Sequence, residues 1–308
     1  MTYLVAADLP DTPAGVRFRA LVDRLGILQL PGAYNGLSAL QAKAAGFEAL
    51  YLSGAAMSAS MGLPDLGILT IDEVCFFIRQ MARAAQLPIL VDGDTGFGEA
   101  LNVMHMVRAF EEAGAGAVQI EDQLLPKKCG HLNDKKLAPA EEMAAKVAAA
   151  AKARKHLYIV ARTDAADSEG MEGAIRRAKL YLEAGADAIF AEALREPDAF
   201  RTFADAIGAP LLANMTEFGR TPLIPASELE ARGCKMVIWP VSALRMAAKT
   251  HEELYAAIRT SGGVQNLLPR MQTRAELYET IGYHHYEALD ASIIRSVVPS
   301  GDPSAGNF

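Results

Sequence analysis

The chain has little of what marks secreted, membrane-spanning or nucleic-acid-binding proteins. Only 3 cysteines are scattered over 308 residues, which predicts no disulfide framework and makes a reducing cytoplasm the expected location. No apolar run approaches the roughly 20 residues that span a bilayer, and the opening residues show no basic-then-apolar signal segment. The formal net charge is −7, and no stretch combines many lysines and arginines with aromatics. Neither a membrane nor a nucleic acid is therefore an expected partner.

What the chain does contain is a repeated unit: a helical stretch, an Ala-Gly pair, and a short apolar run that ends in polar residues. The unit is clearest at residues 42–54, 111–123 and 182–193. The glycine supplies a left-handed helix cap, and the apolar run is typical of a parallel strand buried on both faces. Related runs bring the predicted strands to eight, with the others at residues 26–35, 87–96, 156–164, 209–219 and 235–243.

The spacing of these runs predicts the fold. Strands recur about every 25–35 residues and amphipathic helical segments lie between them, which favours a single (β/α)8 barrel of the TIM type. A doubly wound open sheet is the alternative, but no GxGxxG turn follows the first strand. We expect the barrel to occupy residues 1–262, and a C-terminal helical extension with a frayed tail to occupy residues 263–308.

The extension contains more apolar surface than one barrel needs. Residues 271–293 are predicted to form an additional amphipathic helix, whose stripe includes Leu277, Ile281, Tyr283 and Tyr286. This stripe can pack against the same barrel, or it can be exchanged with a neighbouring subunit. Exchange would make the protein a homo-oligomer.

Polar side chains gather where the predicted strands end, which in (β/α)8 barrels is the catalytic face. Carboxylates follow strands three, four and six, and arginines follow strands five and eight, whereas a solvated rim would carry polar residues of any kind. In chain order the set is Tyr51, Ser53, Asp92, Asp94, Glu121, Asp122, Arg162, Asp164, Glu192, Asn214, Thr216, Glu217 and Arg245.

Asp92 and Asp94 indicate a metal site. Because they are two residues apart, both side chains are expected on one face of an extended strand, where a divalent cation would neutralise their repulsion. Glu121 on the adjacent strand adds a third carboxylate. Ligands that are all oxygen suit Mg2+ or Mn2+ better than zinc. The alternative is a capped turn in which backbone amides satisfy Asp94.

The segment "PKKCGHLND" (126–134) leaves strand four and is expected to lie over the barrel mouth. Its two lysines and its histidine favour the thiolate of Cys129 or make its proton labile, so we predict a chemical role for this cysteine. Cys75 lies on an apolar helical face and Cys234 precedes the eighth strand. Both are predicted to be packing residues.

These motifs together resemble the isocitrate lyase/phosphoenolpyruvate mutase superfamily, and within it the 2-methylisocitrate lyases most closely. The resemblance spans nearly the whole chain. It implies a carbon–carbon lyase that acts on a small di- or tricarboxylate, depends on Mg2+ (with Mn2+ as the alternative), and forms a cytoplasmic homotetramer. The motifs that carry it are "GLPDLGI" (62–68), "VDGDTGFG" (91–98), "IEDQ" (120–123), "KKCGH" (127–131), "ARTDA" (161–165) and "NMTEFGRTPL" (214–223).

The resemblance also implies roles for individual residues. Asp92 and Asp94 match the metal-binding aspartates, with Asp65 and Glu121 reaching the metal or its waters. Substrate-contacting positions are implied at Ser53, Gly54, Ala55, Cys129, Gly130, Arg162, Glu192, Asn214, Thr216, Arg245 and Arg274.

The implied reaction is a retro-aldol-type cleavage of 2-methylisocitrate to pyruvate and succinate. The cation would acidify the substrate hydroxyl, and Tyr51 is the candidate acceptor of its proton. Arginines and polar groups at the strand ends would stabilise the charge on the succinate half, and Cys129 would protonate the carbanion as general acid. Closure of residues 126–134, with Gly130 as hinge, would exclude water.

Two departures from the family pattern bear on the substrate. The turn after strand two reads "SGAA" where the 2-methylisocitrate lyases have Ser-Gly-Gly-Gly, which adds methyl groups at Ala55 and Ala56. Residues 132–134, "LND", replace the usual Arg-Pro-like continuation after the CGH motif. Another 2-hydroxy or 2-oxo diacid, such as 2,3-dimethylmalate, oxaloacetate or isocitrate, is therefore the alternative substrate. From a different functional class, a catalytically silent metal-dependent binding barrel is the alternative.

Overall fold

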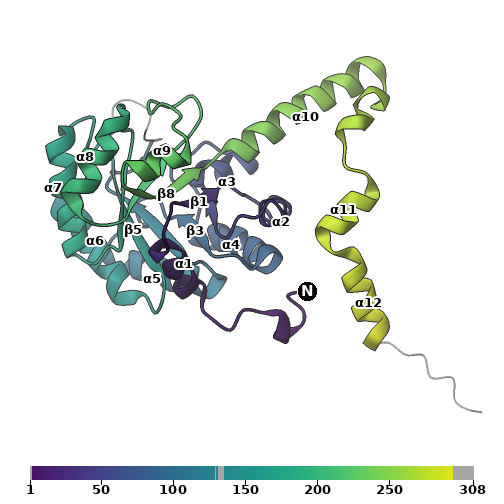
Figure 1. Cartoon of the computed structure of the whole chain (residues 1–308), viewed down its shortest axis with the longest axis horizontal. Coiled ribbons are helices and arrows are strands. Elements are labelled where there is room, and N and C mark those ends of the chain that lie inside the picture. Colours follow the sequence, from purple (N-terminus) through teal and green to yellow (C-terminus); the bar gives the residue numbers. More distant parts are fainter. Residues whose placement is uncertain (1, 129, 131–134, 294–308) are drawn as a thin grey trace, which may run out of the picture.

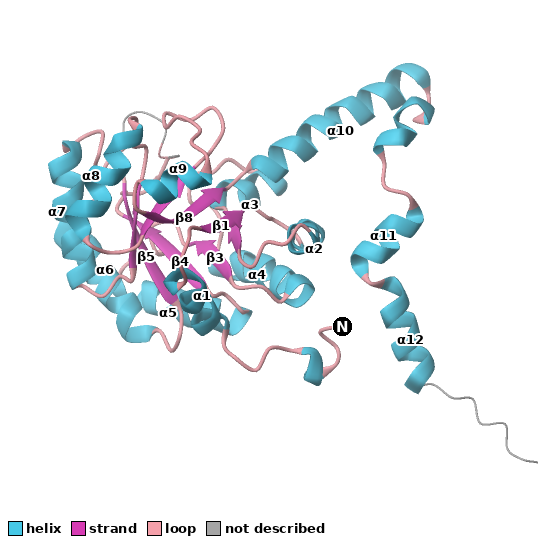
Figure 2. Cartoon of the chain, viewed as in Figure 1, coloured by secondary structure: helices cyan, strands magenta, loops and turns pink. Residues whose placement is uncertain are grey.

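Eight parallel strands form the centre of the protein (Figures 1 and 2). The computed structural model describes residues 2–128, 130 and 135–293. Each of the eight apolar runs overlaps one strand, as predicted, but Cys234 is the first residue of the eighth strand and does not precede it. The strands are β1 Leu28–Pro31, β2 Leu50–Leu52, β3 Ile89–Asp92, β4 Ala117–Glu121, β5 Tyr158–Thr163, β6 Ala188–Ala191, β7 Leu211–Asn214 and β8 Cys234–Trp239.

The strands close into a barrel. They pair in the order β1-β8-β7-β6-β5-β4-β3-β2, and a parallel bridge between Gly32 and Tyr51 joins the end of β1 to β2. A Cβ on residue 32 would lie 2.3 Å from the carbonyl oxygen of Pro240, so only glycine allows the backbones to approach this closely. The prediction of a (β/α)8 barrel is confirmed, and the alternative of an open doubly wound sheet is wrong.

Helices cover the outside of the barrel. In the fourth helix, Thr70 and Glu73 form a reciprocal capping box at the start, and Val74 and Ile78 are buried against the sheet side. Gly114 ends the fifth helix at φ 105°, the left-handed cap that the Ala-Gly pattern predicts. The elements outside the sheet are η1 Ala6–Asp8, α1 Ala14–Asp23, α2 Gly36–Ala44, α3 Gly54–Ser60, α4 Ile71–Ala85, α5 Ala100–Ala113, α6 Ala140–Ala153, α7 Gly170–Glu183, α8 Pro197–Ile207 and α9 Ala226–Ala231.

Alternation along the strands produces a core in two layers. Val118 and Ile120 of β4 belong to the layer between the sheet and the helices, whereas Ala117 belongs to the layer inside the barrel. Helix α1 contributes to the inner layer, where Phe18 packs on Tyr158 with ring centroids 5.4 Å apart. The barrel interior is therefore filled, and space for a ligand is left at its mouth.

After β8 the chain leaves the barrel as a C-terminal arm, residues 242–293, which projects from it (Figure 1). The prediction of one helix over residues 271–293 is wrong, because Gly282 at φ 67° ends one helix and another follows. No described residue of the arm is buried. The arm contacts its own barrel where residues 274–281 meet α2. The elements are α10 Ser242–Ser261, η2 Gln265–Arg270, α11 Arg274–Ile281 and α12 Tyr283–Ile293.

The apolar stripe of the arm is only partly covered in a single chain, and Leu277 on it is half-buried. Tyr283 and Tyr286 keep 39% and 38% of their surface exposed, and Ile281 keeps 40%. The division into a barrel of residues 1–262 and an extension stays a prediction. None of the described helices combines the length and apolar character required to cross a bilayer.

Candidate active site

Inward-facing positions of the strands bring the predicted site residues to the barrel mouth. Because side chains alternate along a strand, the residue two positions beyond an interior apolar residue points the same way. Asp92 follows Leu90 in this manner, and Arg162 follows Val160, with both apolar residues in the inner core layer. The same alternation explains why polar residues collect at one end of the barrel.

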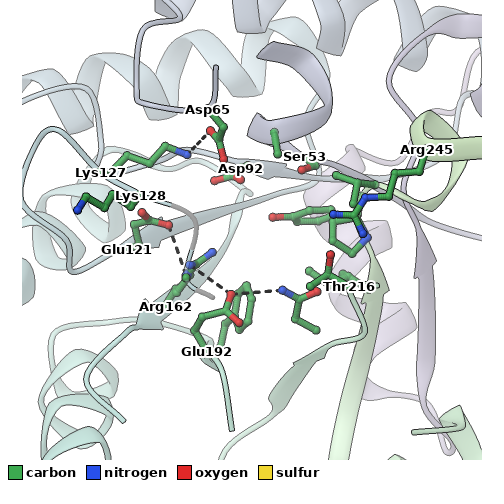
Figure 3. Close-up of a pocket in the computed structure, with 18 residues that line it drawn as sticks. Ser53, Asp65, Asp92, Glu121, Lys127, Lys128, Arg162, Glu192, Thr216 and Arg245 are labelled. Atoms are coloured by element: carbon green, nitrogen blue, oxygen red, sulfur yellow. Dashed lines mark hydrogen bonds and ion pairs between the residues drawn. The ribbon is translucent and has the colours of Figure 1, made fainter. Parts of the chain in front are cut away.

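These side chains line one pocket at the carboxyl ends of the strands (Figure 3). The pocket also has an apolar wall, formed by Phe190, Ile238, Pro240 and Val241. The predicted site residues that it brings together are Tyr51, Ser53, Ala55, Asp65, Asp92, Glu121, Gly130, Arg162, Glu192, Asn214, Thr216 and Arg245.

Asp92 and Asp94 come together through a turn. Strand β3 ends at Asp92 and Asp94 has φ 47°, so the expectation that both lie on one face of an extended strand is wrong. The N–H of Asp94 donates to Oδ1 of Asp92 at 3.2 Å, and the N–H of Gly54 donates to Oδ2 at 3.1 Å. Backbone amides at the end of β3 and the start of α3 therefore fix the Asp92 carboxylate.

Lys127 places its ammonium among the acidic residues. Nζ lies 2.5 Å from Oδ1 of Asp65 and 2.5 Å from Oδ1 of Asp94, and the lysine side chain is only 3% exposed. The contact with Asp65 is a hydrogen bond, whereas the contact with Asp94 is a close ion pair without hydrogen-bond geometry. Burial lowers the pKa of Lys127, but the carboxylates of Asp94, Asp92, Glu121 and Asp65 outweigh it and raise the pKa above the usual value.

The donor set fits a hard divalent cation. Asp65, Asp92, Asp94 and Glu121 offer only oxygen, and Oε1 of Glu121 is buried without a hydrogen-bond partner in the described part of the chain. Burial raises the pKa of Asp94 to about 6 and raises that of Glu121 well above its usual range, although nearby cations oppose both shifts. Among the described residues no three acidic, cysteine or histidine side chains are already arranged as a coordination sphere. Lys127 supplies the positive charge between Asp65 and Asp94.

Arg162 forms the centre of a second charged group. Its guanidinium donates to both oxygens of Asp164, at 2.9 and 3.1 Å, and pairs with Glu121 at 3.4 Å and Glu192 at 3.2 Å. Its Cζ lies 5.0 Å from the ring centroid of Phe190. Burial lowers the pKa of Arg162, but the three carboxylates outweigh it and raise the pKa well above the usual value. The result is a fixed cation in the pocket.

Asp122 supports this group from below the pocket. It is fully buried and accepts hydrogen bonds from the N–H of Asp164 at 2.9 Å, the hydroxyl of Thr163 at 2.8 Å and the phenol of Tyr181 at 2.8 Å. Arg177 of α7 pairs with it at 3.4 Å. Asp122 therefore holds the backbone of Asp164, which in turn orients Arg162.

Arg245 reaches the pocket from the first turn of α10, across the cavity from Arg162 (Figure 3). Its Nη1 donates to the carbonyl oxygen of Glu217 at 2.5 Å and to Oε2 of the same residue at 3.1 Å. Its Cζ lies 5.3 Å from the ring centroid of Phe218, and 44% of the side chain is exposed. Two arginines on opposite sides suit a substrate with separated carboxylates.

Glu192 and Asn214 meet between the two arginines. Oε2 of Glu192 accepts a hydrogen bond from Nδ2 of Asn214 at 3.3 Å, and its Oε1 accepts one from the N–H of Ala193 at 2.8 Å. Oδ1 of Asn214 is buried without a partner in the part of the chain that the structure describes. The amide of Asn214 is thus held with its acceptor available to a ligand.

Gln119 belongs to the site although the sequence analysis did not single it out. Its Oε1 accepts a 2.7 Å hydrogen bond from the phenol of Tyr51, and its Nε2 donates to Asp92 at 3.2 Å and to Glu121 at 3.5 Å. Burial raises the pKa of Tyr51 well above its usual value. This protonated state works against the predicted role of Tyr51 as proton acceptor, which stays a prediction. Gln119 could have been predicted from its place two residues before Glu121, because residues two apart on a strand point to the same face.

Gly130 fits against the floor of the pocket because it has no side chain. A Cβ there would lie 2.3 Å from Cγ of Glu192 and 2.4 Å from Nη2 of Arg162. The ammonium of Lys135 donates to the carbonyl oxygen of Gly130 at 2.5 Å and to Oδ1 of Asp164 at 3.1 Å. The backbone at residue 130 is thereby attached to the charged group around Arg162.

Four predicted site residues are not among those that line the pocket. Gly54 and Asp94 lie next to it, where both contact Asp92 or Lys127. Arg274 is the first residue of α11 in the C-terminal arm and is exposed. Cys129 lies outside the described residues, as do residues 131–134, so its thiol chemistry stays a prediction. Cys75 and Cys234 are buried free thiols, as predicted, and burial raises the pKa of Cys234 to about 12.

Comparison with known proteins decides the family. The family model described as phosphoenolpyruvate phosphomutase matches residues 18–259. The 2-methylisocitrate lyase of Bacillus subtilis is 52% identical over 299 residues, which cover 97% of this chain and 99% of that protein. The chain belongs to the phosphoenolpyruvate mutase/isocitrate lyase superfamily. The resemblance that the motifs indicated is confirmed.

Solved structures within this superfamily share the whole fold. The crystal structure of a 2,3-dimethylmalate lyase matches with a TM-score of 0.86 and 32% identity, covering 95% of this chain and 99% of that one. The structure of oxaloacetate acetylhydrolase in complex with 3,3-difluorooxalacetate matches with a TM-score of 0.86 and 29% identity, covering 92% and 98%. The superfamily thus includes enzymes named for several small diacids.

Proposed function

We propose that this chain is a carbon–carbon lyase that cleaves 2-methylisocitrate to pyruvate and succinate. The observation that carries the proposal is a single pocket in which buried carboxylates, two opposed arginines and an apolar wall face the same space. The identity of 52% to a 2-methylisocitrate lyase over 97% of the chain supports the choice of substrate.

The apolar wall favours a substrate that carries a methyl group. Ile238, Pro240 and Val241 offer no polar side-chain atom to the pocket, so the space beside them suits an alkyl substituent better than a hydroxyl or carboxylate, whereas the Phe190 ring packs against Arg162. Oxaloacetate and isocitrate have no methyl group to place there. The departure "SGAA" affects the pocket only in part, because Ala55 lines it whereas Ala56 is 1% exposed and is not among the lining residues.

The divalent cation would be held by Asp65, Asp92, Asp94 and Glu121. We propose Mg2+, with Mn2+ as the alternative, because all four side chains bind through oxygen. When bound, the cation supplies a Lewis acid that acidifies the substrate hydroxyl.

The protein's own side chains would perform the remaining work. For Tyr51 to accept the substrate hydroxyl proton, its phenol must first release its own proton to solvent, because the buried phenol is protonated. The C–C bond then breaks to leave the carbonyl of pyruvate, and its electron pair stays on the succinate half. Arg162 is held in one orientation before the reaction, so it stabilises that charge without rearranging. The amide nitrogen of Asn214, which uses one N–H on Glu192, donates its second N–H to the same half. Cys129 transfers its thiol proton to the carbanion to complete succinate.

The C-terminal arm supports a proposal about assembly. Its apolar stripe is partly exposed, and Arg274 at the start of α11 does not line the pocket of its own chain. We propose a homo-oligomer, a tetramer by resemblance, in which arms are exchanged between subunits. We also propose that the protein is cytoplasmic and that the boundary between the barrel and the C-terminal extension lies at residue 262.

A substrate comparison tests the function. The purified protein is assayed with 2-methylisocitrate, 2,3-dimethylmalate, oxaloacetate and isocitrate in the presence of Mg2+ or Mn2+, and the products are identified by mass spectrometry. We expect the highest kcat/KM with 2-methylisocitrate and equal amounts of pyruvate and succinate. A higher kcat/KM with another diacid would replace the substrate, and no turnover with any of them would favour a binding protein.

A further inference from the structure

The position of Lys127 bears on how the divalent cation enters the site. Its ammonium contacts one oxygen each of Asp65 and Asp94, two of the four carboxylates proposed to hold the cation. A Cβ on Gly67 would lie 3.6 Å from Cγ of Lys127 and 3.2 Å from Cδ2 of Leu125, so the lysine stem packs along the 62–68 turn. The stem of Lys127 therefore lies beside Gly67, and the ammonium is held by its charge.

The surrounding charges show what the ammonium does there. The side chain of Lys127 is 3% exposed, so Asp65 and Asp94 are paired with it in a poorly hydrated space. The guanidinium of Arg162 is already committed to Asp164, Glu121 and Glu192. Among the described residues, Lys127 is thus the cation that pairs with both Asp65 and Asp94.

We propose that the Lys127 ammonium and the divalent cation are alternative occupants of the Asp65–Asp94 carboxylates. This inference rests on the proposed role of these residues as metal ligands. A cation such as Mg2+ binds oxygen at about 2.0–2.1 Å, so a cation on the two Oδ1 atoms would lie next to an ammonium that stays 2.5 Å from them. Two neighbouring positive charges repel strongly at low dielectric constant. Binding of the cation to these two oxygens therefore displaces Lys127 from them.

Two consequences follow for a protein without this ammonium. Its carboxylates bind the cation more tightly, because no internal ion has to be displaced. Its cation-free form is less stable, because buried carboxylates lose their counter-ion. If Lys127 served only to pack against the turn, its replacement would neither tighten cation binding nor increase the stabilisation of the fold by the cation.

Binding of Mn2+, followed by electron paramagnetic resonance, tests the competition without measuring activity. The full-length variants are Lys127→Met, Lys127→Arg and Lys128→Met. Lys128 is a matched control, because it lines the same pocket and its replacement removes the same charge. We expect Lys127→Met to lower the Kd for Mn2+ by about tenfold or more, the scale of losing a charge-assisted contact. We expect less than about threefold for Lys128→Met, and a Kd at or above that of the wild type for Lys127→Arg.

Thermal unfolding gives a second measurement of cation binding, which is independent of the electron paramagnetic resonance signal. In EDTA, the Tm of Lys127→Met should fall below that of the wild type, and Mn2+ should raise it by more than it raises the wild-type Tm. If Lys127→Met does not fold, Lys127→Gln takes its place in both assays. An unchanged or higher Kd for the uncharged variant overturns the proposal, as does equal tightening by Lys128→Met. No binding of Mn2+ to the wild type would instead refute the proposed metal role.

Discussion

The phenol of Tyr51 donates a 2.7 Å hydrogen bond to Oε1 of Gln119, between strands β2 and β4. The other end of the same amide donates to Oδ1 of Asp92 on β3 at 3.2 Å. Because burial keeps Tyr51 protonated, its phenol O–H needs a hydrogen-bond acceptor, and Oε1 of Gln119 supplies one. Gln119 therefore fixes a candidate catalytic group and a candidate metal ligand relative to each other.

Tyr51→Phe tests whether the phenol is more than a partner for Gln119. If Tyr51 accepts the substrate hydroxyl proton, as proposed, kcat should fall by about 100-fold or more, the usual contribution of general base catalysis. Binding of succinate, measured by calorimetry, should change little because the arginines are intact. A variant with kcat within a few-fold of the wild type would assign the proton to another acceptor.

Gln119→Met should weaken both the fold and the site. The substitution keeps the side-chain length but leaves the Tyr51 hydroxyl without its partner, and Oδ1 of Asp92 keeps only the N–H of Asp94. An unsatisfied buried polar group costs about 1–3 kcal/mol, so the free energy of unfolding should fall by about that amount in a urea titration. Stability equal to the wild type would show that water or another side chain replaces the amide.

The barrel was predictable from the sequence because its signals are local. Apolar runs and Gly caps recur at each unit, and the alternation that fills the barrel also carries Asp92 and Arg162 to the mouth. The turn at Asp94 was not predictable, since its φ of 47° depends on backbone contacts with the neighbouring strand. Lys127 was noted only as a neighbour of Cys129, because the reach of a long side chain depends on the tertiary fold.

Removing a proposed metal ligand should abolish activity and leave the fold intact. Asp94→Ala deletes a carboxylate that is 13% exposed at the rim of the barrel, and no core side chain is shortened. We expect turnover to fall below detection, with an unchanged circular dichroism spectrum. Asp198→Ala is a control for charge, because its side chain is 92% exposed on α8. Full activity of the wild type after treatment with EDTA would contradict the role of the cation.

The three thiols should differ in reactivity. Burial raises the pKa of Cys234 to about 12 and raises the pKa of Cys75 above its usual value, so both stay protonated and unreactive at pH 8. Iodoacetamide at pH 8 should therefore inactivate the enzyme by modifying Cys129, with succinate and Mg2+ protecting it. Peptide mapping that finds only Cys75 or Cys234 modified in inactive protein would refute this assignment.

Cys129→Ser should lower kcat by orders of magnitude and leave substrate binding nearly unchanged. A serine hydroxyl is a much weaker acid than a thiol, whereas Arg162, Arg245 and the carboxylates proposed to hold the cation are untouched. A loss in kcat that exceeds any change in substrate affinity marks an interaction used in the transition state. A variant within a few-fold of wild-type kcat would remove Cys129 from the proton transfer.

Exchange of the C-terminal arm predicts that one active site is built from two chains. Deleting residues 271–308 should lower the mass of the assembly in light scattering, and a monomeric full-length protein at micromolar concentration would contradict exchange. Complementation gives the sharper result. Asp94→Ala and Arg274→Ala should each be nearly inactive, since one lacks a metal ligand and the other a substrate-binding cation. When the two are unfolded together and refolded, a pocket with Asp94 intact can receive an arm with Arg274 intact, and activity should return. If each chain completes its own pocket, the mixture should be no more active than the two variants assayed separately.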